Sequence, residues 1–209
     1  MLQFLTQNVE LLNLLVNVLL VVIWAVYLQI FLVSHLRQTR SVIHIDIGAA
    51  DGERSRCLVT NLSSNPLYIQ GMVAELFEGD QSARVVVTER EEMDQNDLQD
   101  PLKRTNRGTL HPGQTVDIGS LADVVKRAWI RLGREWSVDK LSQVKVTVVA
   151  ISGQAERVVG ASKTFDAQYK QNRSHFVPQN LLTHQIRPRR ARAEFRDILR
   201  DASDDGSVA

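Results

Sequence analysis

The chain has 209 residues, which is enough for one medium-sized domain and a membrane anchor. Its 25 basic and 24 acidic residues leave a net charge of +1, so it lacks the basic excess that marks nucleic-acid-binding proteins. The single cysteine, Cys57, cannot form an internal disulfide, which excludes a disulfide-stapled secreted fold and fits a reducing compartment. Because the charge is balanced, we expect no nucleic-acid partner.

The first feature along the chain is an uncharged apolar segment at residues 11–33. Of its 23 residues, 17 are Leu, Ile, Val or Phe, and as a helix it would be roughly 35 Å long, sufficient to cross a bilayer. Residues 1–10 contain no Lys or Arg, and no small-residue cleavage pattern follows the segment. We predict a short N-terminal tail at residues 1–10 and an uncleaved transmembrane anchor at residues 11–35.

The charges that flank this segment predict its direction across the membrane. Glu10 precedes the segment, whereas Arg37 and Arg40 follow it, and the basic side of a span usually remains in the cytoplasm. The predicted localisation is a membrane, the bacterial inner membrane, which the chain crosses once. The N-terminus is expected outside and the C-terminal domain in the cytoplasm, with the lipid bilayer as the first partner.

One face of the predicted span carries polar and aromatic side chains. At 100° per residue, Glu10, Asn13, Asn17 and Trp24 fall within about 60° of one another. Amides that face lipid are unfavourable, and an interhelical amide hydrogen bond contributes about 1 kcal/mol, so a second helix would stabilise this face. We identify Asn13, Asn17 and Trp24 as the transmembrane association face, with hydration of Asn13 at the interface as the alternative.

After Arg40 the hydrophobic period changes to the alternation typical of β-strands, with Ile43, Ile45 and Ile47 on one side. Further β-branched or alternating runs, separated by turn residues, predict strands at residues 55–62, 67–77, 83–90, 115–118, 144–151 and 157–165. The third and fourth strands are expected to form a hairpin, and so are the last two. We predict one β domain over residues 41–168.

One helix is expected inside this domain, at residues 120–133. Ser120 and Asp123 have the spacing of a capping box, and apolar residues recur with the helical period before Gly133. One side of this helix must pack on a sheet. About seven short strands with one inserted helix match the strand count of an immunoglobulin-like β-sandwich.

Three short motifs lie in the predicted strands and turns: Val59-Thr-Asn-Leu-Ser, Pro66-Leu-Tyr-Ile and Leu110-His-Pro-Gly-Gln-Thr-Val. Together they resemble the pattern of bacterial immunoglobulin-like domains, including the CARDB-like group, in which a V-x-N strand precedes an L-x-P-G turn. The resemblance covers about sixty residues, and the paired cysteines and intervening tryptophan of antibody domains are missing. It implies a mainly β fold that serves as a binding or structural module.

Residue patterns that indicate catalysis or metal binding are absent from the sequence. The five histidines form no H-x-H or H-E-x-x-H pair, and no phosphate-binding glycine loop or serine-elbow motif occurs. Asp46, Asp51 and Glu53 lie near a turn but lack EF-hand spacing. Cys57 alternates with polar neighbours, as a buried strand residue does. We predict no enzyme activity, no cofactor, no metal and no small-molecule substrate.

Two segments carry concentrated charge of opposite sign. Residues 89–100 contain six acidic side chains, and residues 187–192 contain four arginines. Each segment is either a run of solvated charges or a binding segment. Because their charges are opposite, the two segments could also bind each other.

The arginines lead into a predicted amphipathic helix within a basic tail at residues 169–202. Such a helix can lie on a lipid surface, dock on a partner or fold against its own domain, and we favour docking on a partner. Residues 203–209 are expected to be a disordered end. The predicted partner-binding residues are Arg187, Arg189, Arg190, Arg192, Phe195 and Leu199.

These features favour a membrane-anchored, cytoplasmic protein-interaction or assembly module that binds a protein partner or forms a homo-oligomer. One alternative is an accessory subunit of a larger membrane complex, held through Asn13 and Asn17. A less favoured alternative is a sensor or enzyme that binds metal or a small ligand in a pocket between the inserted helix and the sheet, which convergence of His44, His111 or Asp51 on one cavity would support.

Overall fold

The computed structural model of the chain describes residues 8–38, 40–48, 55–90, 104–133, 140–153, 157–170 and 173–205. The chain divides into two compact units, Met1–Arg40 and Ser41–Ala209. The first unit contains α2 (Val9–Gln38), whose Val9–Leu36 stretch is long and apolar enough to cross a membrane and is exposed among the described residues. The predicted apolar helix is therefore present, and it extends beyond residues 11–35 at both ends.

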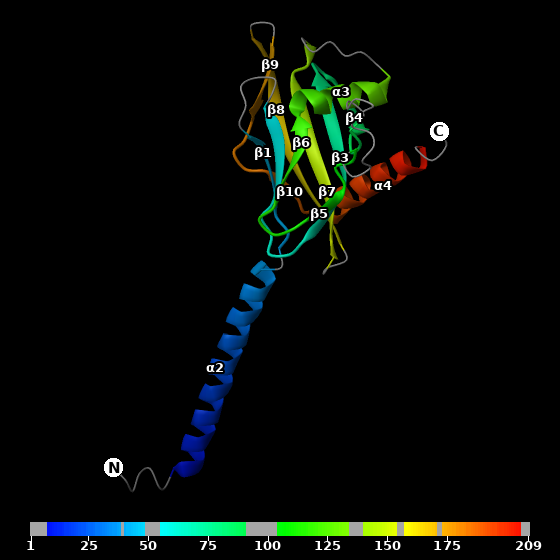
Figure 1. The fold of residues 1–209 in the computed structure, drawn as a ribbon. Helices are drawn as coiled ribbons and strands as arrows, with labels where there is room; N and C mark the ends of the chain where they lie inside the picture. The colour runs from blue at the N-terminus through cyan, green and yellow to red at the C-terminus, as the bar shows by residue number, and fades with distance from the viewer. Residues whose placement is uncertain are drawn as a thin grey trace. The chain divides into compact units, whose positions relative to one another are not determined.

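The second unit is mainly β, and its described part forms two antiparallel sheets (Figure 1). The three-stranded sheet has the order β1-β2-β6, with β1 at Ile43–Gly48, β2 at Arg56–Asn61 and β6 at Thr115–Ser120. The seven-stranded sheet has the order β10-β8-β7-β3-β4, with β5 paired to β3 and β9 paired to β8. Its strands are β3 (Leu67–Glu78), β4 (Gln81–Val86), β5 (Gly108–Leu110), β7 (Gln143–Ser152), β8 (Arg157–Lys170), β9 (Arg173–Pro178) and β10 (His184–Ile186).

Both predicted hairpins are confirmed by the strand register. β3 pairs with β4 from Val73↔Val86 to Glu78↔Gln81, across a tight turn in which Gly79 has a φ of 57°. β7 pairs with β8 over its whole length. β7 also pairs with β3, so it lies inside the sheet, as its density of β-branched residues predicts.

The main hydrophobic core lies between the two sheets. Ile45 of β1 and Val59 of β2 are fully buried with Met72 and Leu76 of β3 and Phe165 of β8. Because side chains alternate along a strand, one face of each sheet supplies this core. The two sheets therefore bury a common apolar layer, which is the coarse arrangement that the alternating sequence predicts.

The helix inside the domain is α3, Leu121–Leu132. Ser120 and Asp123 form the predicted capping box, and Gly133 ends the helix in the left-handed conformation. Leu121, Val124, Val125 and Ala128 are buried in the main core, so one side of the helix packs on the sheets as expected.

Arg127 of α3 is fully buried and joins the two sheets on this side of the domain. Its Nη2 donates to the carbonyl of Ile118 in β6 at 2.7 Å, and its Nη1 donates to the carbonyl of Val87, just after β4, at 3.5 Å. A buried guanidinium must hydrogen-bond, and here its partners are edge carbonyls of different sheets. The helical period did not predict this burial.

Side chains also join the sheets on the opposite side, where β1 faces the segment at β10. Gln185 accepts a hydrogen bond from Ile43 N at 3.1 Å and donates to Ile43 O at 2.7 Å. Thr183 Oγ1 accepts from Ile45 N at 2.8 Å and lies 3.1 Å from Ile45 O. These two side chains satisfy the outer edge of β1 much as a neighbouring strand would.

The chain after residue 168 contains more structure than the predicted basic tail. β8 continues to Lys170, β9 and β10 both pair with β8, and α4 spans Arg189–Asp205. Residues 169–202 thus extend the larger sheet before the helix begins, and α4 covers the first residues of the expected disordered end. Residues 206–209 and the acidic residues 91–100 lie outside the described residues.

α4 packs on the outer face of the seven-stranded sheet, the face turned away from the main core (Figure 1). Phe195 and Leu199 are buried there with Val73 and Val149. Gly71 of β3 admits the helix, because a Cβ at this position would lie 2.6 Å from Leu199 Cδ2 and 2.9 Å from Thr88 Oγ1.

Replacing Gly71 with Ala should loosen α4. Overpacking of this kind costs about 1–3 kcal/mol, so we expect a lower midpoint of thermal unfolding and faster proteolysis within residues 189–205. Gly153→Ala is the matched control, since a Cβ at Gly153 meets nothing within 4 Å. Equal stability of the two variants would contradict the packing of Leu199 over Gly71.

Replacing both Thr183 and Gln185 with near-isosteric apolar residues should open the outer edge of β1. We expect Thr183→Val/Gln185→Met to lower the free energy of unfolding by about 1–3 kcal/mol, because the Ile43 and Ile45 amides lose their acceptors. Hydrogen exchange at those two amides measures the effect. As a control, Leu182→Ala changes an exposed neighbour and should leave the exchange of the Ile43 and Ile45 amides unchanged. If Thr183→Val/Gln185→Met also left that exchange unchanged, the role of Thr183 and Gln185 would be refuted.

Candidate interaction surface

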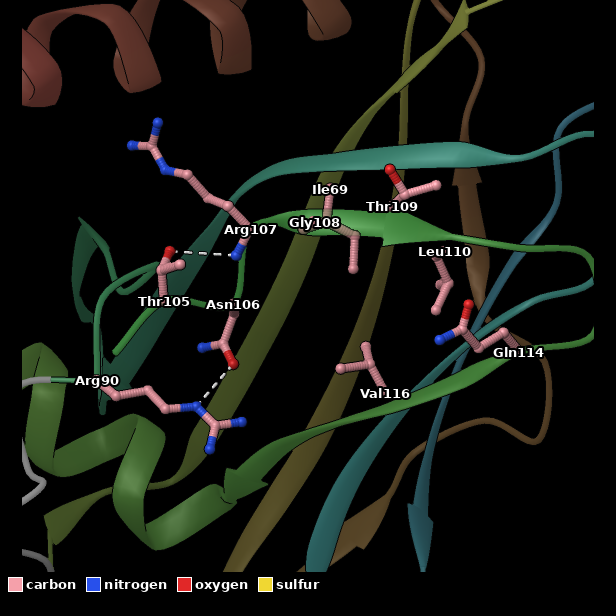
Figure 2. Close-up of a pocket in the computed structure, with 10 residues that line it drawn as sticks. All are labelled: Ile69, Arg90, Thr105, Asn106, Arg107, Gly108, Thr109, Leu110, Gln114 and Val116. Atoms are coloured by element: carbon pink, nitrogen blue, oxygen red, sulfur yellow. Dashed lines mark hydrogen bonds between the residues drawn. The ribbon is translucent and has the colours of Figure 1, made fainter. Parts of the chain in front are cut away.

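A pocket of about 310 Å³ is lined by residues of β3, β5, β6 and the segment before β5 (Figure 2). Ile69, Leu110 and Val116 supply apolar surface, while Arg90 and Asn106 supply polar groups. A concave site with a few polar groups is the usual form of a ligand site, so the bonding of those polar groups decides what it can do.

The polar side chains of this pocket hydrogen-bond within the protein. Arg90 Nε donates to Asn106 Oδ1 at 3.0 Å, and Arg90 Nη2 donates to the carbonyl of Asp117 in β6. Asn106, which is 4% exposed, donates to the carbonyl of Thr88 at 3.2 Å. Figure 2 shows the guanidinium of Arg107 directed away from the Arg90–Asn106 pair. These bonds join the segment after β4 to the segment before β5 and to β6, so we assign the pocket's polar groups a structural role.

The predicted partner-binding residues divide into two groups in the structure. Phe195 and Leu199 are 8% and 7% exposed and face the protein's own sheet, so they are covered while α4 is docked. Of the three routes open to an amphipathic helix, the structure shows folding against its own domain. Arg187, Arg189 and Arg190 are exposed at the start of the helix.

Arg192 is intermediate in burial between these two groups. It is partly buried, and its Nη1 donates to the carbonyl of Val158 in β8 at 3.0 Å. Its Nε is buried and has no hydrogen-bond partner among the described residues. Arg192 therefore contributes to the attachment of α4 more than to the exposed basic surface.

A cluster on β3 and β4 holds the middle of α4 in place. Arg84 pairs with Glu75 at 3.2 Å and with Glu194 of the helix, and its guanidinium lies 5.5 Å from the centre of the Phe195 ring. Lys145 of β7 also pairs with Glu75, at 3.4 Å. These exposed pairs contribute modestly, but together with the cation–π contact they fix the register of the helix. Sequence reasoning missed Arg84, because only the fold brings it beside the helix.

The charges of α4 oppose its macrodipole. Its first turn contains no acidic residue and its last turn no basic one, whereas Arg189 and Arg190 stand at its start and Asp204 and Asp205 at its end. Such an arrangement lowers the intrinsic stability of a helix, by about 0.3–1 kcal/mol for each charge. Packing on the sheet must therefore supply most of the stability of α4.

The transmembrane association face lies on α2. Asn13, Asn17 and Trp24 are all exposed, and Trp24 makes an edge-to-face contact with Tyr27 at a centroid distance of 6.2 Å. The side-chain amides are therefore accessible to another helix. Their association remains a prediction.

Of the residues in the less favoured sensor hypothesis, His44 has side-chain contacts, and His111 is exposed in the turn after β5. His44 Nδ1 lies 3.2 Å from Thr183 Oγ1, and His44 Nε2 lies 3.6 Å from Asp46 Oδ2. Among the described residues, no group of three His, Cys, Asp or Glu side chains is placed to hold a metal ion. Asp51 lies outside the described residues.

Asp46 of β1 joins the nearly buried Lys163 of β8 across the sheets, with Nζ and Oδ1 3.1 Å apart. Burial alone would raise the pKa of the Asp46 carboxyl, but the hydrogen bond and positive charge of Lys163 outweigh it, so this pKa lies below its usual value. Lys163 also donates to the carbonyl of Leu181 at 3.3 Å. This pair is a third link on the β1 side of the domain.

Comparison with known proteins finds no matching family model, no similar curated protein and no similar solved structure.

Cys57 should be inert in the folded protein. Burial raises the pKa of its thiol to about 12, and the Asp117 carboxylate adds to this effect. We expect little iodoacetamide labelling at pH 8 in the folded chain and ready labelling in urea. A cysteine at the exposed Ser82 serves as the accessible control, and equal labelling of Cys57 and that control would contradict the burial.

The raised pKa of the Cys57 thiol also determines how folding stability depends on pH. The folded state holds the thiol proton more tightly than the unfolded state, whose ordinary pKa is about 9. The contribution of Cys57 to stability is therefore fully present below pH 9 and declines as the pH rises toward 12.

Proposed function

We propose that this chain is a single-pass membrane protein whose β domain, placed in the cytoplasm, binds or assembles a protein partner without catalysing a reaction. The observation that carries the proposal is α2, a long apolar helix whose membrane-length stretch is exposed in the described part of the chain. Exposing so much apolar surface to water is unfavourable, whereas insertion in lipid is favourable. Only residues 39–42 separate this helix from β1, so the domain would be tethered at the membrane surface.

The direction of the anchor rests on flanking charge. Arg37 and Arg40 on the domain side favour a cytoplasmic domain, in the inner membrane of a bacterium. The fold proposed for the domain is an immunoglobulin-like β-sandwich of the bacterial type. Two antiparallel sheets around one core support this assignment, as do the V-x-N and L-x-P-G motifs.

The partner surface that we favour is the exposed arginine group at the start of α4, namely Arg187, Arg189 and Arg190. The three side chains share one short exposed segment, and none belongs to the packing that holds the helix. Arginine binds carboxylates through a rigid pair of N–H donors, so an acidic protein surface is the matching partner.

A second candidate is supported by the amides of α2. Asn13 and Asn17 are exposed and lie one helical turn apart, so they can hydrogen-bond to another helix within the membrane. Through them the chain would be an accessory subunit of a larger membrane complex or a homo-oligomer.

Affinity purification of the full-length chain from membranes in mild detergent tests both candidates. We expect Arg187→Gln/Arg189→Gln/Arg190→Gln to reduce the recovery of a partner severalfold, because the basic contacts are lost. Lys126→Gln/Lys140→Gln/Arg157→Gln removes the same charge from other exposed positions and should not reduce it.

In the same assay, Asn13→Leu/Asn17→Leu separates the two candidates. Loss of the partner in this variant alone would indicate an accessory subunit bound through the membrane helix. Recovery of the chain without any partner, in every variant, would contradict the proposed interaction function.

A further inference from the structure

A second pocket, of about 380 Å³, lies between α4 and the outer face of the seven-stranded sheet. Its floor is aliphatic, formed by Val149 and Ile151 of β7, Val158 of β8 and Leu199 of α4. The volume is at the lower end of the range for small-molecule sites, so it suits one short apolar chain.

The rim of this pocket is polar and basic. It consists of Gln70 of β3 with Arg196 and Arg200, which lie one turn apart on α4. Arg196 Nε donates to Asp197 at 3.1 Å, and Arg200 has no ion-pair partner in the described part of the chain. Both guanidiniums are exposed, so they can meet a charged group at the mouth of the pocket.

We propose that this pocket binds a free single-chain amphiphile with an anionic oxygen head group, such as a medium-chain fatty carboxylate. The apolar chain lies on the aliphatic floor, where burial contributes about 25 cal/mol per Å². The head group lies between Arg196 and Arg200, whose planar guanidiniums pair with carboxylate oxygens. The floor supplies most of the affinity, and the arginines supply selectivity for an anion.

The backbone around the floor favours a lipid-like ligand over a peptide. Val149 and Ile151 lie in a strand that pairs on both sides, with β3 and with β8. The carbonyl of Val158 already accepts a hydrogen bond from Arg192. A peptide backbone would therefore find no free strand edge on β7, whereas an acyl chain needs none.

The site is separate from the proposed partner surface. Arg187 precedes α4, Arg189 and Arg190 lie in its first turn, and none of the three lines the pocket. Nothing in the sequence predicts the pocket, because its lining comes from four elements and the helical period shows only that α4 is amphipathic.

Photolabelling of the full-length protein tests the proposal. The chain is placed in nanodiscs of phosphatidylcholine and exposed to dodecanoate carrying a diazirine on its chain, and labelled residues are mapped by mass spectrometry. We expect labels on the floor of the pocket, at Val149, Ile151, Val158 and Leu199, and competition by unlabelled dodecanoate. Dodecanol and dodecyltrimethylammonium should compete poorly, because they lack the anionic head group.

Matched charge variants isolate the contribution of the rim. Arg196→Gln/Arg200→Gln should weaken labelling by about five- to tenfold, since two exposed guanidinium–carboxylate contacts are lost. Arg189→Gln/Arg190→Gln changes the same charge on the same helix and should leave labelling intact.

Several outcomes would overturn the proposal. Labels confined to residues 9–38 would show partitioning into the bilayer only. Equal labelling of the two charge variants, or equal competition by dodecanol, would remove the role of the arginines. Stronger competition by lysophosphatidic acid in the disc would replace the free ligand with a membrane lipid, and competition by an acidic peptide but not by dodecanoate would replace it with a protein partner.

Discussion

The strands at the two edges of the smaller sheet pair with no strand of the larger sheet in the described part of the chain, so side chains must connect the layers. On one side, Thr183 and Gln185 satisfy the edge of β1. On the other, Arg127 bridges carbonyls of both sheets. An unsatisfied buried edge group costs about 1–3 kcal/mol, which makes these few polar contacts as necessary as the apolar core. The packing of the two sheets around the main core depends on these contacts.

The two faces of the larger sheet pack against different parts of the domain. The inner face contributes to the main core, whereas the outer face is covered over part of its area by α4. The absence of a side chain at Gly71 brings Leu199 close to the backbone, and Arg84 and Arg192 fix the position of the helix. The exposed arginines and the pocket beside them both follow from this one packing arrangement, which is why both proposed binding sites involve the C-terminal helix.

The sequence predicted those elements whose signal is local. Alternation located the main strands, and the Ser120–Asp123 capping box located α3 to within one residue. The sequence analysis missed three short strands: β5 and β10, which have three residues each, and β9. Short strands without alternation acquire their structure from the partner strand. The buried state of Arg127, the Lys163–Asp46 pair and the pocket under α4 could not be predicted, since each joins segments far apart in the chain. For α4, periodicity identified the apolar face, but only the structure shows that the chain's own sheet covers it.

The placement of charge along α4 has a mechanical consequence. A helix whose charges oppose its own dipole has little stability away from its support, so leaving the sheet and losing helical form should occur together. A segment that measures about 26 Å as a helix would then become a coil able to extend to nearly 60 Å. Release would change both the reach of the arginines and the surface below them, because Val73 and Val149 would meet water. A single docking equilibrium would thereby control how far these arginines can extend from the sheet.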